Sequence, residues 1–449
     1  MKIKFLGAAG TVTGSSYALT SDSGQSILID LGMFQGTEEI EKLNYLRYDY
    51  DCSKLSGIIL THAHLDHCGR LPIAIKNGFR GKIWLTAPTY DLTALSLLDT
   101  AKIAIKDDRP ILFNEKQVFK TISRFAIVKY HQKFKIGNFE ITFFDAGHLL
   151  GSASVLVEDT KSNSKIKKVV FSGDLGNSPD SLLMPLEFIK DADVVVMEST
   201  YGDKLHPKSD PSEELEREII EIVKTGGTLL IPAFALDRTQ KVLHLIKHLK
   251  AEGKIPYELP VYLDGPMAQK AIDIYLKYFD FFNYNFQSEL SKEPPFYFPG
   301  LKVVMRYEES IAIRTSQETK IIIAGSGMMN GGRIVAHAAA FLGDSKNRIF
   351  LVGYQGEETL GREILDGASQ VIIDEETIFI KAHVSHTESM SSHADQGQLI
   401  DWLSNIKGVS KVILTHGEDE QRRVLADKIA ETLSINEVFL PNLNQEIEI

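Results

Sequence analysis

The residues best suited to chemistry form a short cluster, His62-Ala-His64-Leu-Asp66-His67, in a chain of 449 residues. Three of the 13 histidines fall within these six positions, directly after the apolar segment 57–61. Imidazole and carboxylate groups at alternating and adjacent positions can point toward two centres, which a single tetrahedral zinc ion would not require. The spacing therefore predicts a metal site on a loop at the end of a β-strand.

Three more candidate ligands each follow a predicted strand and stand beside a glycine: His148, Asp174 and His416. Taken singly, each is more typical of a turn than of a metal site. A strand end is rigid, and the glycine lets the backbone approach a crowded centre. Together with the first cluster, these side chains are expected to converge on one edge of a sheet.

The elements that must position these groups are mostly short strands in the first two hundred residues, with fewer helices. We expect strands at 3–6, 27–30, 57–61, 82–86, 140–145, 153–157, 169–172 and 194–198, and helices at 71–76 and 87–105. Beyond residue 203, strands and helices alternate, which predicts βα units on a mostly parallel sheet. The last segment returns to strands at 377–380 and 412–415 and a helix at 418–433.

Composition sets broad limits on the class of protein. Hydrophobic residues make up 43% and charged residues 24%, as in soluble globular proteins, which excludes disordered, collagen-like and coiled-coil chains. No apolar run reaches the ~18 residues of a membrane-spanning helix, and we expect no membrane partner. Two cysteines, Cys52 and Cys68, fit a reducing compartment, so we expect a cytoplasmic protein. The net charge of −11 opposes non-specific attraction to nucleic-acid phosphates.

The candidate ligands, with Asp30 after the second predicted strand, resemble the motifs of the metallo-β-lactamase fold family. The sequence also resembles the β-CASP branch, nucleic-acid-processing hydrolases in which a second domain is inserted into that fold. The three extra motifs of this branch are matched by Glu198 in Met197-Glu-Ser-Thr-Tyr201, His393 in Ser391-Ser-His-Ala-Asp395 and His416 in Thr415-His-Gly-Glu418. Within the branch, the chain is similar to the bacterial and archaeal relatives of the endonuclease subunit that cleaves pre-mRNA before polyadenylation.

This resemblance implies an α/β protein with a four-layer αββα metallo-β-lactamase fold and an inserted α/β β-CASP domain with a mostly parallel sheet. We expect the first fold to comprise residues 1–203 and 375–449, and the inserted domain residues 204–374. In this family, members that act on RNA have a histidine at the last motif, and members that act on DNA have an apolar residue there. His416 therefore implies RNA.

The resemblance also implies two Zn²⁺ ions per chain, one held by His62, His64 and His148, the other by Asp66, His67 and His416, with Asp174 bridging them. The expected activity is hydrolysis of RNA phosphodiester bonds by a two-metal hydroxide mechanism, in RNA processing or decay. Asp66 would orient the nucleophile. His393 would protonate the leaving 3′-oxygen, with Glu198 holding its imidazole, and Asp30 would support a ligand from outside the metal shells.

Other features are weaker. Ser326, Gly331, Gly332 and Arg333 precede a predicted helix and are suited to a phosphate, although glycines at this place more often make a turn. His244 and His248 lie one turn apart on a predicted helix with no third ligand evident nearby, so we expect no metal there. The aromatic segment 281–298 suits base stacking, internal packing or a dimer contact.

Two other functions fit the same motifs. A hydrolase of small esters or thioesters would need neither the inserted domain nor the three extra motifs. A non-catalytic RNA-binding scaffold would lack some of the metal ligands, but this sequence has a residue at every ligand position. We expect single-stranded RNA as the partner and leave a homodimer open. The sequence does not distinguish endonuclease from exonuclease action, and gives neither the RNA preference nor the biological target.

Overall fold

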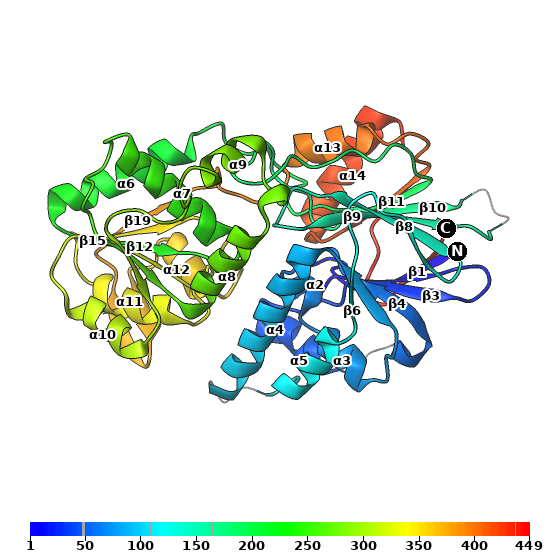
Figure 1. Ribbon diagram of the computed structural model, residues 1–449, viewed down its shortest axis with the longest axis horizontal. Helices are drawn as coiled ribbons and strands as arrows, with labels where there is room; N and C mark the ends of the chain where they lie inside the picture. The colour runs from blue at the N-terminus through cyan, green and yellow to red at the C-terminus, as the bar shows by residue number, and fades with distance from the viewer. Residues whose placement is uncertain (47–49, 107–109, 163–165, 436) are drawn as a thin grey trace. The chain divides into compact units, whose positions relative to one another are not determined.

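The computed structural model describes residues 1–46, 50–106, 110–162, 166–435 and 437–449. They form two compact units, one of Met1–Leu205 with Ser392–Ile449 and one of His206–Ser391 (Figure 1). The second unit extends to Ser391 rather than to residue 374. The reason is that β19 (His383–His386) pairs in parallel with β16 (Arg348–Leu351) of that unit, after a hairpin of β17 (Gln370–Ile373) and β18 (Glu376–Phe379).

The first unit contains two seven-stranded sheets. The first has the order β22-β1-β2-β3-β4-β5-β6, in which β3 to β6 are parallel and the others antiparallel. Its strands are β1 (Lys2–Gly7), β2 (Ser16–Thr20), β3 (Ser26–Ile29), β4 (Leu55–Ile59), β5 (Lys82–Leu85), β6 (Phe125–Ile127) and β22 (Glu446–Glu448).

The second sheet has the order β21-β20-β11-β10-β9-β8-β7. Its strands are β7 (Phe134–Ile136), β8 (Phe139–Asp145), β9 (Ala153–Asp159), β10 (Lys168–Phe171), β11 (Val194–Glu198), β20 (Lys411–Thr415) and β21 (Glu437–Phe439). Strands β10, β11 and β20 are parallel, and β8 runs the same way because two antiparallel steps through β9 separate it from β10. The carboxyl ends of these four strands therefore meet at one edge of the sheet.

The two sheets face each other across a shared core that includes Phe5 and Ile29 of the first and Phe143 and Phe171 of the second. Helices α3 (Leu71–Lys76), α4 (Ala87–Lys106) and α5 (Glu115–Ile122) cover the outer face of the first sheet, and α13 (Gln396–Ser404) and α14 (Asp419–Leu433) cover that of the second (Figure 1). Two short helices, α1 (Glu38–Lys42) and α2 (Leu65–Cys68), lie in loops. This is the four-layer αββα arrangement, and the predicted fold class is confirmed.

The second unit is built on a parallel sheet of six strands in the order β14-β13-β15-β12-β16-β19. The strands not yet named are β12 (Thr228–Pro232), β13 (Val261–Asp264), β14 (Leu301–Val304) and β15 (Lys320–Ala324). Its helices are α6 (Pro211–Thr225), α7 (Arg238–Ala251), α8 (Pro266–Lys277), α9 (Tyr284–Leu290), α10 (Tyr307–Thr315), α11 (Arg333–Phe341) and α12 (Leu360–Leu365). The expected alternation of strand and helix is present.

Three rings of the aromatic segment after α8 are packed inside the second unit. Phe282, Phe286 and Phe296 are buried, and their rings contact one another and Tyr275 of α8. Burial removes these three rings from base stacking and gives them a structural task. Among the described residues, no helix is both long enough and apolar enough to cross a membrane.

Besides the short α1 and α2, two longer helices of the first unit, α5 and α13, were not expected from the sequence. Each begins with a capping box, Asn114 with Gln117 and Asp395 with Gln398, in which side chain and backbone satisfy each other's hydrogen bonds. These pairs are the local signal that would have identified both helices.

Candidate metal centre

The candidate ligands lie in the first unit, each just beyond the carboxyl end of a strand. His62 and His64 follow β4, and His64 is the residue before α2, which carries Asp66 and His67. His148, Asp174 and His416 follow β8, β10 and β20, whose ends share one edge of the second sheet. The structure thus brings all seven predicted ligands together.

The first group of donor atoms consists of three imidazole nitrogens and one carboxylate oxygen. Nδ1 of His64 lies 3.1 Å from Nε2 of His62 and 3.1 Å from Nε2 of His148. Oδ2 of Asp174 lies 3.4 Å from Nε2 of His62 and 3.6 Å from Nε2 of His148. Four donor atoms therefore surround one point.

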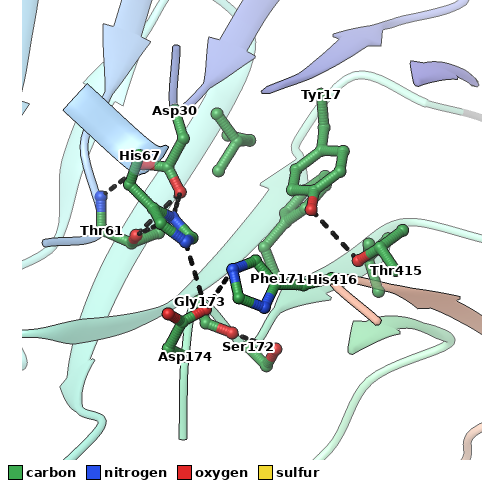
Figure 2. A pocket seen from close by; sticks show the side chains of 12 residues that line it. Tyr17, Asp30, Thr61, His67, Phe171, Ser172, Gly173, Asp174, Thr415 and His416 are labelled. Carbon is green, nitrogen blue, oxygen red and sulfur yellow. Dashed lines mark hydrogen bonds and ion pairs between the residues drawn. The ribbon is translucent and has the colours of Figure 1, made fainter. Parts of the chain in front are cut away.

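The second group uses the other oxygen of Asp174 (Figure 2). Oδ1 of Asp174 lies 3.2 Å from Nε2 of His67 and 3.7 Å from Nε2 of His416. Oδ2 of Asp66 lies 3.2 Å from Nε2 of His416 and 3.9 Å from Nε2 of His67. The two oxygens of Asp174 therefore belong to different donor groups.

Contacts behind the histidines orient their rings. Nδ1 of His67 donates to Oδ2 of Asp30 at 2.7 Å, and Nδ1 of His148 donates to the carbonyl of Ser392 at 3.1 Å, since a carboxylate and a carbonyl can only accept. Nδ1 of His416 lies 3.0 Å from the hydroxyl of Thr200. For His67 and His148, a proton on Nδ1 turns Nε2 toward the donor groups, as a metal ligand requires.

Asp30 lies behind His67, outside both donor groups. Its two oxygens accept the backbone N–H and the hydroxyl of Thr61, both at 2.8 Å. Sequence reasoning did not single out Thr61, Thr200 or Ser392. Their positions in the sequence could have indicated them. Thr61 precedes His62, Ser392 precedes His393, and Thr200 follows Glu198 by two residues.

The electrostatics of the centre mostly suit a cation. Burial lowers the pKa of His62 and of His148 well below the ordinary value, so both rings are neutral. Burial alone would raise the pKa of Asp174, but the neighbouring His416 and His67 rings hold it well below the usual range. His67 differs: burial opposes its protonation, yet Asp174 and Asp30 raise its pKa well above the usual value, so a proton competes with a cation for Nε2.

One observation in each group favours a bound cation. Oδ1 of Asp174 is buried without a well-aligned hydrogen-bond partner among the described residues. Nδ1 of His148 holds the proton, which leaves the lone pair of Nε2 for a cation beside the donor atoms of His62, His64 and Asp174. A divalent ion would satisfy both features, and nitrogen and oxygen donors in this number suit Zn²⁺.

A third pair of side chains, Glu198 and His393, lies beside the donor groups. Nδ1 of His393 is 3.2 Å from both oxygens of Glu198, which is buried at the end of β11. The ring centre of His393 is 4.5 Å from that of His148. Burial opposes protonation of His393, but the Glu198 carboxylate raises its pKa to about 9. The pair therefore presents a protonated imidazole next to the candidate metal centre.

The weaker group, Ser326, Gly331, Gly332 and Arg333, lies in the second unit between β15 and α11. The guanidinium of Arg333 donates to Asp264 and to the carbonyls of Val304 and Met305, which ties three segments together. The hydroxyl of Ser326 accepts the N–H of Asn330 at 3.0 Å, a contact within the turn itself. The structure thus ties the guanidinium of Arg333 to the fold, and phosphate binding by this group stays a prediction.

Known protein families match three stretches of the chain. The metallo-beta-lactamase superfamily matches residues 9–233, the Beta-Casp domain residues 239–364, and the Zn-dependent metallo-hydrolase RNA specificity domain residues 377–441.

Individual proteins match over nearly the whole chain. It is 36% identical to Ribonuclease TTHA0252 of Thermus thermophilus, covering 96% of both chains. It is 32% identical to RNase aCSPSF2 of Saccharolobus solfataricus, covering 100% of this chain and 85% of the relative. A crystal structure of a protein of unknown function from Enterococcus faecalis V583 has a TM-score of 0.57 at 14% identity, covering 100% of this chain and 99% of that one, which shows a shared fold.

Proposed function

Because the chain belongs to the metallo-beta-lactamase superfamily and carries its Beta-Casp domain, we propose that it is a zinc-dependent ribonuclease acting on single-stranded RNA. The observation that carries the proposal is the pair of donor groups sharing Asp174, with the Glu198–His393 pair beside them. The match to an RNA specificity domain and two relatives named as ribonucleases support RNA as the substrate.

In this proposal His62, His64, His148 and Asp174 hold one zinc ion, and Asp66, His67, His416 and Asp174 hold the other. Two such ions, when bound, lower the pKa of a water molecule and polarise a phosphodiester oxygen. Asp66 keeps 18% of its side chain exposed, so it is placed to orient the attacking water as well as to bind.

His393 is the proposed general acid. Since Nδ1 faces Glu198, the proton reaches the leaving 3′-oxygen from Nε2. The side chain keeps 22% exposure, which leaves it within reach of a substrate. Glu198 acts as a positioning residue, because its carboxylate is itself held by the N–H groups of Leu175 at 2.7 Å and Thr200 at 3.3 Å.

The two alternatives have less support. A non-catalytic scaffold would have no need for the assembled ligands or for the buried Glu198 behind His393. A hydrolase of small esters or thioesters would have no need for the RNA specificity domain matched at residues 377–441.

The test uses one nucleotide sequence, end-labelled as RNA and as DNA. The zinc-loaded protein should cleave the RNA, a chelator should abolish cleavage, and added zinc should restore it. DNA and a chromogenic thioester or lactam should react at least about 100-fold more slowly. A ladder from one end would indicate an exonuclease, and discrete internal products an endonuclease.

The matched control is His393→Ala protein purified in the same way, which detects a contaminating nuclease. Cleavage of RNA that persists in full after chelation, or a preference for the small ester, would overturn the proposed function.

A further inference from the structure

A further set of side chains that could hold a metal ion lies in the second unit and includes none of the residues proposed for catalysis. His244 and His248 come from consecutive turns of α7, and Glu289 comes from α9, 41 residues beyond His248 in the chain. The sequence indicated the two histidines but no third ligand, and the fold supplies it. We propose that His244, His248 and Glu289 bind a further divalent cation, with zinc as the preferred ion.

The donor atoms of this group converge closely. Oε2 of Glu289 lies 2.8 Å from Nε2 of His244 and 3.1 Å from Nε2 of His248, and the two nitrogens lie 3.0 Å apart. Donor atoms around a tetrahedral zinc ion, at about 2.1 Å from the metal, stand about 3.4 Å apart. An expansion of a few tenths of an ångström would therefore admit the ion.

Hydrogen bonding alone satisfies this arrangement poorly. If both Nε2 atoms carry protons, two N–H groups meet at 3.0 Å; if only one does, the lone pair of the other faces the carboxylate. A cation at the centre accepts all three lone pairs at once. Two histidines one helical turn apart with a carboxylate from another element form a donor set typical of zinc.

The surroundings hold the carboxylate in place and keep it charged. Nζ of Lys247 lies 2.8 Å from Oε1 of Glu289, which leaves Oε2 toward the histidines. The ammonium group of Lys247 beside Oε1 favours the ionised form of the carboxylate, as a metal ligand requires.

The group is also accessible from one side. The side chain of His244 is 9% exposed and that of Glu289 is 18% exposed, whereas that of His248 is 44% exposed. A buried floor with one open side gives the ion an entry path.

The bound ion would stabilise the packing of α9. Phe286 of α9 contacts the ring of His244 edge-on, with ring centres 5.1 Å apart, and is buried with Phe282 and Phe296. An ion shared by α7 and α9 would therefore tie the aromatic segment 279–299 to the helix beside it. This assigns the site a structural task that is independent of RNA cleavage.

The test counts zinc per chain in the full-length protein after chelation, reloading with zinc alone and removal of excess. His248→Gln and Glu289→Gln should each hold one zinc ion fewer than the wild-type protein. The control is His131→Gln in the first unit, whose ring lies 3.1 Å from the carboxylate of Glu187 and belongs to none of the candidate donor groups among the described residues. This control should hold the same number of zinc ions per chain as the wild-type protein.

A second readout is hydrogen exchange of segment 279–299. Zinc should slow exchange there in the wild type and in His131→Gln, but not in His248→Gln, which is expected to fold because His248 lies at the surface. Equal zinc content in the wild type and both site variants would overturn the proposal. If the wild-type protein holds one zinc ion more than the site variants but does not cleave RNA, this site would be upheld and the proposed function refuted.

Discussion

At the residue scale, two neighbouring histidines of the first unit make different contacts. The ring centres of His393 and His416 are 5.7 Å apart. Nε2 of His416 faces the carboxylates of Asp66 and Asp174. Nδ1 of His393 faces the carboxylate of Glu198. These contacts are consistent with the proposed roles of His416 as a ligand and His393 as a proton donor.

His393→Ala should keep the zinc content of the wild type and lose RNA cleavage by about 10²- to 10⁴-fold, the usual contribution of a general acid. Zinc analysis and single-turnover cleavage of the same preparation measure both quantities. Normal cleavage by the zinc-loaded variant would remove His393 from the mechanism.

His416→Ala should lower the zinc content by about one ion per chain, because the second donor group loses one of its nitrogens. Cleavage should fall as a consequence of the lost ion. A variant with unchanged zinc stoichiometry would show that His416 is not a ligand.

Asp145, at the end of β8, should make stability depend on pH. Burial, reinforced by the nearby Glu187 carboxylate, raises the pKa of Asp145 to about 8. An unfolded aspartate titrates near pH ~4, so between pH ~4 and 8 the unfolded chain loses a proton that the folded chain keeps, and stability falls as the pH rises. Asp145→Asn should remove this loss, and since the side chain is only half-buried we expect a gain of about 1–2 kcal/mol at pH 8.5.

Urea unfolding followed by tryptophan fluorescence measures the effect, since both tryptophans, Trp84 and Trp402, lie in the first unit. At pH 4.5 the variant and the wild type should be almost equally stable. A difference of the same size at pH 4.5 and pH 8.5 would contradict this assignment of the pKa.

At the element scale, the ligands depend on tight turns after the strands. Gly147 and Gly173 have left-handed backbones, with φ of 65° and 58°, which side chains rarely allow. Gly32, beyond β3, is packed against α2 so closely that a Cβ there would lie 1.5 Å from the carbonyl oxygen of Asp66. The glycines therefore set how closely the loops carrying the ligands approach one another.

Gly32→Ala should push the start of α2 away, which displaces Asp66 and His67, lowers zinc content and costs about 1–3 kcal/mol of stability. Gly343→Ala is the control, because its Cβ would meet only the carbonyl of Phe379 at 3.9 Å, and its stability should change by less than about 0.5 kcal/mol. Zinc analysis and urea unfolding test both variants. Full zinc content in Gly32→Ala would mean that the two loops can separate without affecting the ligands.

At the scale of the whole molecule, net charge limits how RNA is bound. The chain carries 49 basic and 60 acidic residues, for a net charge of −11. Such a protein attracts phosphate backbones poorly over its general surface. Two zinc ions would add about four positive charges at one place, so we expect binding to depend on a few phosphates near the metal centre.

The affinity of zinc-loaded His393→Ala for a short labelled single-stranded RNA should therefore fall only slightly with salt. A slope of log K against log salt concentration of about −1 to −2 is expected, since each neutralised phosphate of a single strand contributes about −0.7. Fluorescence anisotropy between 50 and 200 mM salt, roughly the range over which such slopes are measured, provides the value. A slope of about −5 or steeper would indicate an extended basic track instead.

Short stretches of chain were enough to identify most of the fold and the candidate ligands that the structure brings together. The strand ends that carry His148, Asp174 and His416 were evident because an apolar run, a glycine and a metal-binding residue are neighbours in the sequence. Helix α3 lies at the predicted residues for the same reason, since helical periodicity is a local property.

Only the tertiary structure decided which side chains meet. Glu289 joins His244 and His248 through the packing of α9, and the guanidinium of Arg333 turns inward to Asp264. The sharing of the two oxygens of Asp174 between two donor groups likewise depends on strands from two sheets. Such contacts join residues tens to hundreds of positions apart, and no pattern of neighbouring residues specifies them.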